Sequence, residues 1–146
     1  MEIVEGNILD IEKGIVAHQC NTMGAMNAGL ARSIRQKYPL VYERYKRFCD
    51  AGLFVLGTAR MVKVSEVPLY ICNLAGQEKY GRDRQYTDYD AVRLALRRLA
   101  RMSDASGLQV YLPYLMGCGL GGGDWTIVSG IIEQECPDAI VVRLPN

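Results

Sequence analysis

Five glycines lie between residues 117 and 123, in a segment whose composition suits the binding of an anion. The segment follows a strand-like run at residues 109–113 and precedes a helical pattern that begins at Trp125. Glycine lacks a Cβ and adopts positive φ readily, so several backbone N–H groups of such a loop can point at one anion. The following helix adds the positive end of its dipole, and phosphate is the anion that most often uses this arrangement. The pattern predicts phosphate binding and leaves open which phosphate is bound.

A second segment suited to ligand binding spans residues 18–31. It follows a strand-like run, carries the amide of Asn21 and two glycines, and enters a helical pattern. Amides hydrogen-bond sugar hydroxyls without the cost of burying a charge. The alternative is an ordinary strand-to-helix connection with Asn27 as N-cap, and spacing does not separate the two. Considered by itself, His18 is more consistent with a structural role, since a lone histidine at a strand end more often makes a structural hydrogen bond than acts as an acid or base.

Asp124 supports two interpretations of equal weight. As the residue that opens a helix it is a good N-cap, which alone would explain it. Beside a glycine loop and Trp125 it could instead orient or deprotonate a water molecule. Asn73 and the polar residues 77–84 follow another strand-like run, and their composition favours a lid near the same region.

The cysteines predict free thiols. Their number is odd, no C-x-x-C pair occurs, and a single histidine gives a zinc site poor raw material. Three of them, Cys20, Cys72 and Cys118, lie near the ends of predicted strands and could cluster in space. A free cysteine is usually a small buried hydrophobic residue. The alternative interpretation is a catalytic thiol.

The elements that must position these residues alternate along the chain. Strand patterns cover residues 2–5, 15–18, 58–64, 69–74, 109–113 and 139–144, and helical patterns cover residues 28–38, 41–51, 88–105 and 125–136. The strands at 58–64 and 69–74 are close enough to form a hairpin around residues 65–68. This order predicts an α/β fold, a three-layer α/β/α sandwich with a mixed, mostly parallel central sheet. Ligands bind such sheets at the carboxyl ends of strands, which groups the loops after His18, Leu74 and Pro113 around one crevice.

Composition indicates an ordinary globular protein. The chain has 146 residues, 49% hydrophobic and 23% charged, which predicts one domain over residues 1–146 and excludes wholesale disorder. The net charge of +1 excludes a global field toward nucleic acid or membrane. No apolar run approaches the roughly 20 residues of a membrane span, and the acidic first strand does not resemble a signal peptide. We expect a cytoplasmic monomer.

Arginines repeat at helical spacing in the longest predicted helix, at Arg93, Arg97 and Arg101. They could form a stripe for nucleic acid. The neutral total charge favours a solvated helix face instead.

Three motifs, taken together in order and spacing, resemble the macrodomain, an ADP-ribose-binding α/β module. They are Gly6-Asn7-Ile8 after the first strand, His18-x-Cys-Asn21 leading to Gly29-Leu30-Ala31, and residues 117–125. The resemblance spans nearly the whole chain. Within the family the chain is most similar to the branch of ADP-ribose 1″-phosphate phosphatases and terminal ADP-ribose protein glycohydrolases. The segment from His18 to Asn21 and Tyr38-Pro39 look particularly like the phosphatases.

The resemblance implies roles for individual residues. Asn7 stands where the family usually has an aspartate that accepts a hydrogen bond from the adenine amino group, and Ile8 would line the adenine pocket. An amide accepts this bond without charge assistance, which implies weaker adenine binding. Asn21 is associated with the distal ribose. The residues implied in the two phosphate loops are Gly29, Leu30, Ala31, Gly117, Cys118, Gly119, Leu120, Gly121, Gly122 and Gly123.

The chain also departs from the glycohydrolase pattern. Where that subgroup has a lysine nucleophile and an aspartate, this sequence has Gln77 and Gly121, with Lys79 and Asp124 displaced by two and three residues. These departures argue against a covalent lysyl mechanism. The phosphatase-like members have a histidine in the first loop and an aspartate near the second, which His18 and Asp124 could supply.

Two hypotheses from different classes follow. The first is a hydrolase without metal or cofactor that acts on ADP-ribose 1″-phosphate or on ADP-ribose ester-linked to a macromolecule. In it, Asp124 activates water, His18 assists by proton transfer, Asn21 faces the distal ribose, and loop amides stabilise the developing phosphate charge. The second is a reader that binds free or protein-linked ADP-ribose without chemistry. A nucleic-acid binder that uses the arginine helix is the weaker third.

Overall fold

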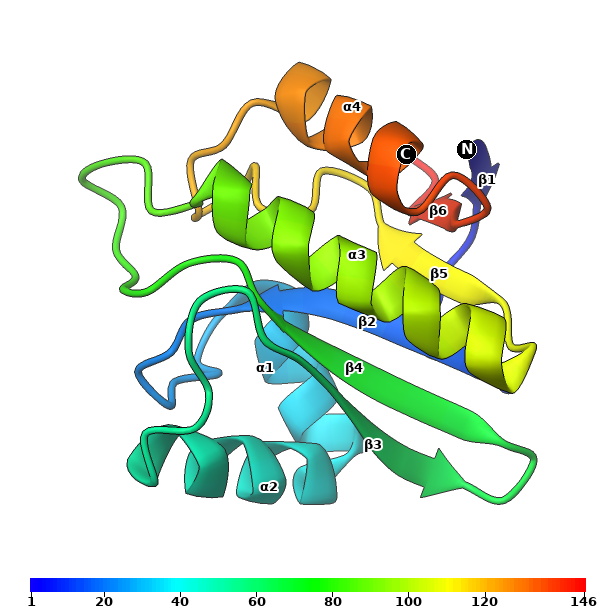
Figure 1. Cartoon of the computed structure of the whole chain (residues 1–146), viewed down its shortest axis with the longest axis horizontal. Helices are drawn as coiled ribbons and strands as arrows, with labels where there is room; N and C mark the ends of the chain where they lie inside the picture. The colour runs from blue at the N-terminus through cyan, green and yellow to red at the C-terminus, as the bar shows by residue number, and fades with distance from the viewer.

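The computed structural model describes residues 1–146 and contains one six-stranded sheet with helices on both faces (Figure 1). The strands are β1 (Glu2–Glu5), β2 (Gly14–Cys20), β3 (Ala59–Ser65), β4 (Leu69–Ala75), β5 (Val110–Pro113) and β6 (Ile140–Arg143). The helices are α1 (Gly29–Lys37), α2 (Pro39–Asp50), α3 (Tyr89–Ser106) and α4 (Trp125–Glu135), with a short 3-10 helix η1 (Ile8–Asp10). Every strand and helix predicted from the sequence is present, with ends that differ by a few residues.

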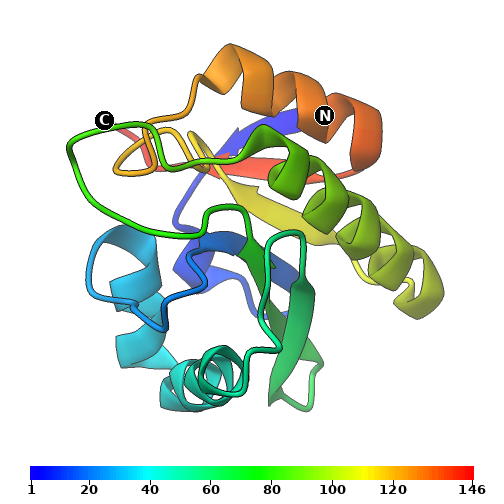
Figure 2. The same ribbon diagram turned by 60° about the vertical axis from the view of Figure 1, so that its left-hand side comes forward.

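The strand order is β1-β6-β5-β2-β4-β3. All neighbouring strands are parallel except β3 and β4, which form the predicted antiparallel hairpin. Helices α3 and α4 cover one face of the sheet, and α1 and α2 cover the other, as the two views together show (Figures 1 and 2). The predicted three-layer sandwich with a mixed, mostly parallel sheet is confirmed.

The central strand β2 shows why the sheet is buried on both sides. Its side chains alternate between the two faces, as in any strand. Ile15 and Ala17 belong to the apolar cluster beneath α3 and α4, whereas Val16 and Cys20 belong to the cluster beneath α1 and α2. Residues 15–17 of β2 therefore read as a short continuous apolar run, as expected of a strand between two helical layers.

Local signals explain most helix boundaries. Asp88 caps α3 by accepting a hydrogen bond from the Ala91 N–H, and Gly107 ends the helix in the left-handed conformation at φ 71°. Pro39 ends α1 as predicted, but α2 begins at Pro39 itself, two residues before the predicted start. Proline is well placed in the first turn because its missing N–H would have no intrahelical partner there.

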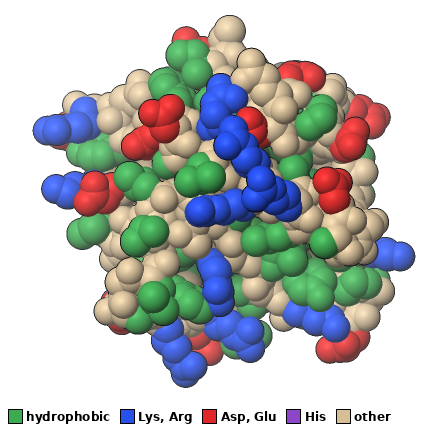
Figure 3. Space-filling model, viewed as in Figure 1, with side chains coloured by type: hydrophobic (Ala, Val, Ile, Leu, Met, Phe, Trp, Pro, Cys, Tyr) green, Lys and Arg blue, Asp and Glu red, His purple; other side chains and the backbone are tan.

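The arginines of α3 lie on a face where Lys and Arg side chains gather (Figure 3). Arg97 makes two hydrogen bonds of 3.0 and 3.1 Å to the Glu135 carboxylate, and Arg93 lies 3.5 Å from the same group. This pairing holds the pKa of the Glu135 carboxyl below its usual value. Part of the stripe is thus neutralised within the fold, which favours the solvated-face interpretation.

Two further observations concern the chain as a whole. All five cysteines are free thiols. None of the helices combines the length and the apolar character required to cross a bilayer.

Candidate functional site

One cavity of about 430 Å³ lies at the carboxyl ends of β2, β4 and β5. Its walls come from residues 18–31, 77–82 and 113–121, the three loops that the topology groups together. The predicted crevice is therefore present. Its volume falls within the roughly 300–1,000 Å³ typical of small-molecule sites.

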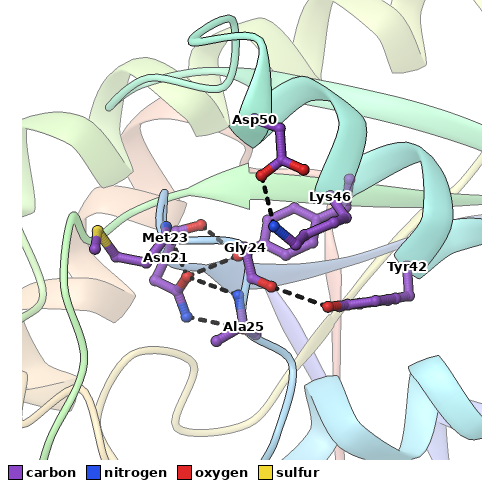
Figure 4. A network of polar contacts seen from close by, with 8 residues as sticks. Asn21, Met23, Gly24, Ala25, Tyr42, Lys46 and Asp50 are labelled. Carbon is purple, nitrogen blue, oxygen red and sulfur yellow. Dashed lines mark hydrogen bonds and ion pairs between the residues drawn. The ribbon is translucent and has the colours of Figure 1, made fainter.

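The first wall is held in shape by Asn21 (Figure 4). The Asn21 Nδ2 donates to the Ala25 carbonyl at 2.9 Å, and Oδ1 accepts from the Met23 N–H at 2.9 Å. The Tyr45 hydroxyl, from α2, lies 2.7 Å from both oxygen atoms of Asn21. Because Nδ2 carries two hydrogens and Ala25 takes one, Asn21 retains one donor while it orders the loop.

Helix α2 supports the same loop at a second point. The Tyr42 hydroxyl donates to the Gly24 carbonyl at 3.2 Å (Figure 4), and the Arg35 guanidinium lies 3.6 Å from the centre of the Tyr42 ring. Arg35 also donates to the side chain of Asn27. Asn27 is therefore engaged elsewhere, and the interpretation of Asn27 as the N-cap of α1 was wrong. The N-cap is Ala28, which offers no side-chain hydrogen bond.

The second wall is the glycine segment, which folds back on itself. The Gly117 carbonyl accepts from the Gly123 N–H at 2.8 Å and from the Thr87 hydroxyl at 2.7 Å, and the Gly121 carbonyl accepts from the Thr87 N–H at 3.0 Å. A Cβ placed on Gly121 would lie 2.5 Å from Thr87 Oγ1 and 2.7 Å from the Gly117 carbonyl oxygen. Only glycine fits this position without a shift of the loop.

Free backbone donors coincide with the cavity lining. In the glycine segment, Cys118, Gly122 and Gly123 donate their N–H groups to carbonyls of the same segment or of Leu115, and none of these three lines the cavity. The N–H groups without an acceptor in the protein belong to residues that line it, namely Gly117, Gly119, Leu120 and Gly121. The same holds for the first turn of the uncapped helix α1, at Gly29, Leu30 and Ala31. Two opposite walls therefore carry seven unpaired N–H groups, an arrangement suited to an anion.

A side chain not predicted from the sequence joins the walls. The Gln19 Nε2, at the end of β2, donates to Gln77 Oε1 at 2.9 Å and to Thr87 Oγ1 at 2.8 Å, while its own Oε1 is buried without a partner. The alternation of side chains along β2 could have identified Gln19 from the sequence, because Gln19 lies on the same face as the apolar Ile15 and Ala17. A polar side chain on a buried face requires a specific partner.

His18 lines the cavity but is 2% exposed. Its Nε2 lies 2.7 Å from Asn73 Oδ1, and Cys20 Sγ lies 3.5 Å from the same nitrogen. Burial lowers the pKa of His18 to about 4, so the imidazole is neutral at pH 7. An oxygen acceptor at Asn73 assigns the hydrogen to Nε2. Burial and the contact to Asn73 favour the structural interpretation of His18 over a role as an imidazolium acid.

Two of the thiols, Cys20 and Cys72, are likewise buried, and Cys118 is half-buried. Cys20 lines the cavity, and burial raises the pKa of its thiol well above the usual value. Burial also raises the pKa of Cys118 to about 11 and that of Cys72 to about 12. Protonated thiols are poor nucleophiles, which favours the structural interpretation of these residues.

Several predicted site residues lie outside the cavity lining. Asp124 is exposed, accepts from the Thr126 N–H at 2.8 Å and caps α4. Asn7 is exposed and caps η1, a helix not predicted from the sequence, and Ile8 is buried in the core cluster beneath α1 and α2. Lys79 does not line the cavity, whereas Gln77 does.

Comparison with known sequences found no matching family model, but did find curated relatives. An ADP-ribose 1″-phosphate phosphatase of Aspergillus oryzae is 34% identical over 183 aligned positions, which cover 96% of this chain and 91% of the relative. A DNA ADP-ribosyl glycohydrolase of Mycobacterium tuberculosis is 26% identical over 145 residues, 96% of this chain. The chain spans only 40% of the length of that mycobacterial relative.

Solved structures share the fold over nearly the whole chain. A protein of unknown function from Bacteroides thetaiotaomicron is 28% identical, with a TM-score of 0.88 over 99% of this chain and 97% of the other. The macrodomain of Mycobacterium tuberculosis DarG is 22% identical, with a TM-score of 0.83 over the same shares of the two chains. The fold of this chain, its motifs and its relationship to the Aspergillus protein lead to one assignment: the chain belongs to the macrodomain family.

Proposed function

We propose that this chain binds ADP-ribose in the cavity and hydrolyses a bond at the terminal ribose. The substrate would be ADP-ribose 1″-phosphate or ADP-ribose ester-linked to a macromolecule. The printed names of the Aspergillus and mycobacterial relatives support this class of substrate, as does a Thermosipho africanus protein of the same fold that was solved in complex with ADP-ribose. Because the chain matches only part of the mycobacterial relative, its macromolecular substrate belongs to the proposal.

The observation that carries the proposal is the coincidence of unpaired backbone donors with the cavity walls. The diphosphate would lie between the first turn of α1 and the glycine segment, and its oxygens would accept from the seven free N–H groups. The positive end of the α1 dipole adds to the attraction. Hydrogen bonds to a charged group contribute about 1.5–3 kcal/mol each, so a few suffice to hold the ligand.

The terminal ribose would lie toward Asn21, whose Nδ2 retains a hydrogen for a sugar hydroxyl. Water would attack the phosphorus of a 1″-phosphate, so that the P–O bond to the ribose breaks and inorganic phosphate leaves. In an ester it would attack the acyl carbon, so that the bond to the ribose oxygen breaks and a carboxylate leaves. In both cases the ribose oxygen takes up a proton and ADP-ribose is released. Asp124 is the predicted residue for activating that water, but its carboxylate caps α4 in this structure. Its participation requires the side chain to leave the Thr126 N–H and turn toward the cavity.

The alternative function, a reader without chemistry, is favoured by two observations. Asp124 does not line the cavity, and the buried His18 is neutral at pH 7. Calorimetry with ADP-ribose, run beside turnover assays with each of the two substrates, separates the functions. Tight binding with turnover of either substrate supports the hydrolase, and binding with turnover of neither supports the reader. Absence of binding would refute both.

The predicted monomeric state and cytoplasmic location also remain proposals. Light scattering of the purified chain and fractionation of the host cell measure them.

A further inference from the structure

We propose that Arg82 recognises a phosphoryl group attached to the terminal ribose, so that the site selects ligands with negative charge at that end. This inference rests on the proposed function, because it assumes that ADP-ribose occupies the cavity. It assigns a specificity-determining role to a residue of the segment between β4 and α3.

The charge of the cavity lining is the first argument. Arg82 is the only lining residue with a formal charge, since His18 is neutral and no aspartate or glutamate lines the cavity. Backbone dipoles can hold the diphosphate. A further phosphoryl group adds about −1.5 to −2 charges, and among the lining residues only the Arg82 side chain carries a positive charge that can pair with it.

Arg82 is exposed, and its side chain makes no ion pair or hydrogen bond within the protein, unlike Arg35, Arg84, Arg93, Arg97, Arg98 and Arg143. Its neighbour Arg84 lies 3.5 Å from Asp83 Oδ2, and the Tyr86 hydroxyl donates to the other oxygen of Asp83. Both oxygens of Asp83, the acid next to Arg82 in sequence, are thus engaged by other residues. The guanidinium of Arg82, a lining residue, is therefore free to bind an anionic ligand.

The segment that contains Arg82 connects the two walls of the cavity. At one end, the Thr22 N–H and hydroxyl donate to the Glu78 carbonyl at 3.0 and 3.1 Å, next to Asn21. At the other end, the Tyr86 N–H donates to the Gly121 carbonyl at 2.8 Å. Figure 2 shows the segment arching beside the loops that follow β2 and β5.

Between these two anchors, Tyr80, Gly81 and Arg82 line the cavity. These three residues follow Glu78, which is bonded to Thr22 beside Asn21. The terminal ribose would point toward Asn21. Arg82 can therefore contact a group beyond that ribose. The competing possibility is that Arg82 contacts the diphosphate itself, in which case it would affect every ADP-ribose ligand equally.

The test measures the dissociation constants of ADP-ribose and of ADP-ribose 1″-phosphate by rapid competition against a fluorescent ADP-ribose. The variants are Arg82→Ala, Arg82→Lys and the matched control Arg84→Ala, each checked for folding by circular dichroism. We expect wild type to prefer the phosphorylated ligand by about tenfold. Arg82→Ala should remove this preference and leave the ADP-ribose constant within about twofold, Arg82→Lys should keep part of it, and Arg84→Ala should match wild type.

Equal weakening of both ligands in Arg82→Ala would overturn the inference in favour of a diphosphate contact. Unchanged constants in Arg82→Ala, or loss of the preference in Arg84→Ala, would overturn it as well. Failure of wild type to bind either ligand would instead refute the proposed function, so the two failures are distinguishable. An ionic contact also predicts that the preference shrinks as salt rises from 0.05 to about 0.5 M, because exposed charges are screened.

Discussion

The substitution Gly121→Ala tests the geometry on which ligand binding depends. The added Cβ would lie 2.5 Å from Thr87 Oγ1 and 2.7 Å from the Gly117 carbonyl oxygen, whereas ordinary van der Waals contact begins at 3.4 Å. The second contact is with backbone, so a side-chain rotation cannot relieve it. The glycine segment must move by several tenths of an ångström, and it carries four of the seven free N–H groups that line the cavity.

The size of the effect follows from two free-energy changes, a loss of folding stability and a loss of binding free energy. Forcing an extra carbon into a packed site costs about 1–3 kcal/mol of folding stability. Displacing one N–H from a phosphate oxygen removes about 1.5–3 kcal/mol of binding free energy, which corresponds to roughly 10- to 100-fold in affinity. We expect Gly121→Ala to lower stability modestly and to raise the ADP-ribose dissociation constant by at least about tenfold.

Isothermal titration calorimetry measures the change in affinity, and urea unfolding measures the change in stability. The control is Gly130→Ala in α4, where a Cβ meets nothing within 4 Å. This control should bind like wild type and gain up to about 1 kcal/mol of stability, because alanine favours a helix over glycine. Wild-type affinity and stability in Gly121→Ala would show that the steric reasoning is wrong.

Three further predictions concern the surrounding side chains. Thr87→Val should lower the free energy of unfolding in urea by about 1–3 kcal/mol, because it leaves the Gln19 amide without one of its acceptors. Wild-type stability in this variant would contradict a stabilising role for the hydrogen bond between Gln19 and Thr87. For His18, burial lowers the pKa to about 4 from 6.5 in the unfolded chain, so the unfolded state binds more protons in this window. The free energy of unfolding should fall by up to about 3 kcal/mol as pH drops from 6.5 to 4. If a His18→Gln variant loses as much stability over the same pH range, His18 is not the cause of the loss. Asp124→Asn should keep the α4 cap and near-wild-type stability; a large loss of turnover would then indicate a chemical role, and full turnover would leave Asp124 as a cap alone.

Much of the scaffold could be predicted because its signals are local. Alternation and apolar periodicity marked every strand and helix, and Pro39 marked the break between α1 and α2. The grouping of the three loops followed from the parallel sheet, in which strand ends meet at one edge. The glycine segment was identified from composition alone, since close backbone approach needs residues without a Cβ.

The details of the site depend on contacts that are distant in sequence. Gln19 meets Thr87 across 68 positions, and the Tyr45 hydroxyl reaches Asn21 across 24. No local pattern predicts either contact. Asn27 was a reasonable N-cap by type, yet Arg35 engages its side chain and Ala28 takes the cap position.

The most direct measurement of the central claim is an amide nuclear magnetic resonance titration with ADP-ribose. The account predicts large downfield proton shifts at the unpaired N–H groups of both walls, namely Gly29, Leu30, Ala31, Gly117, Gly119, Leu120 and Gly121. The internally bonded N–H groups of Cys118, Gly122 and Gly123 should shift much less. Shifts confined to other parts of the chain, or no shift at a roughly millimolar ligand concentration, would contradict the claim that these backbone donors hold the diphosphate.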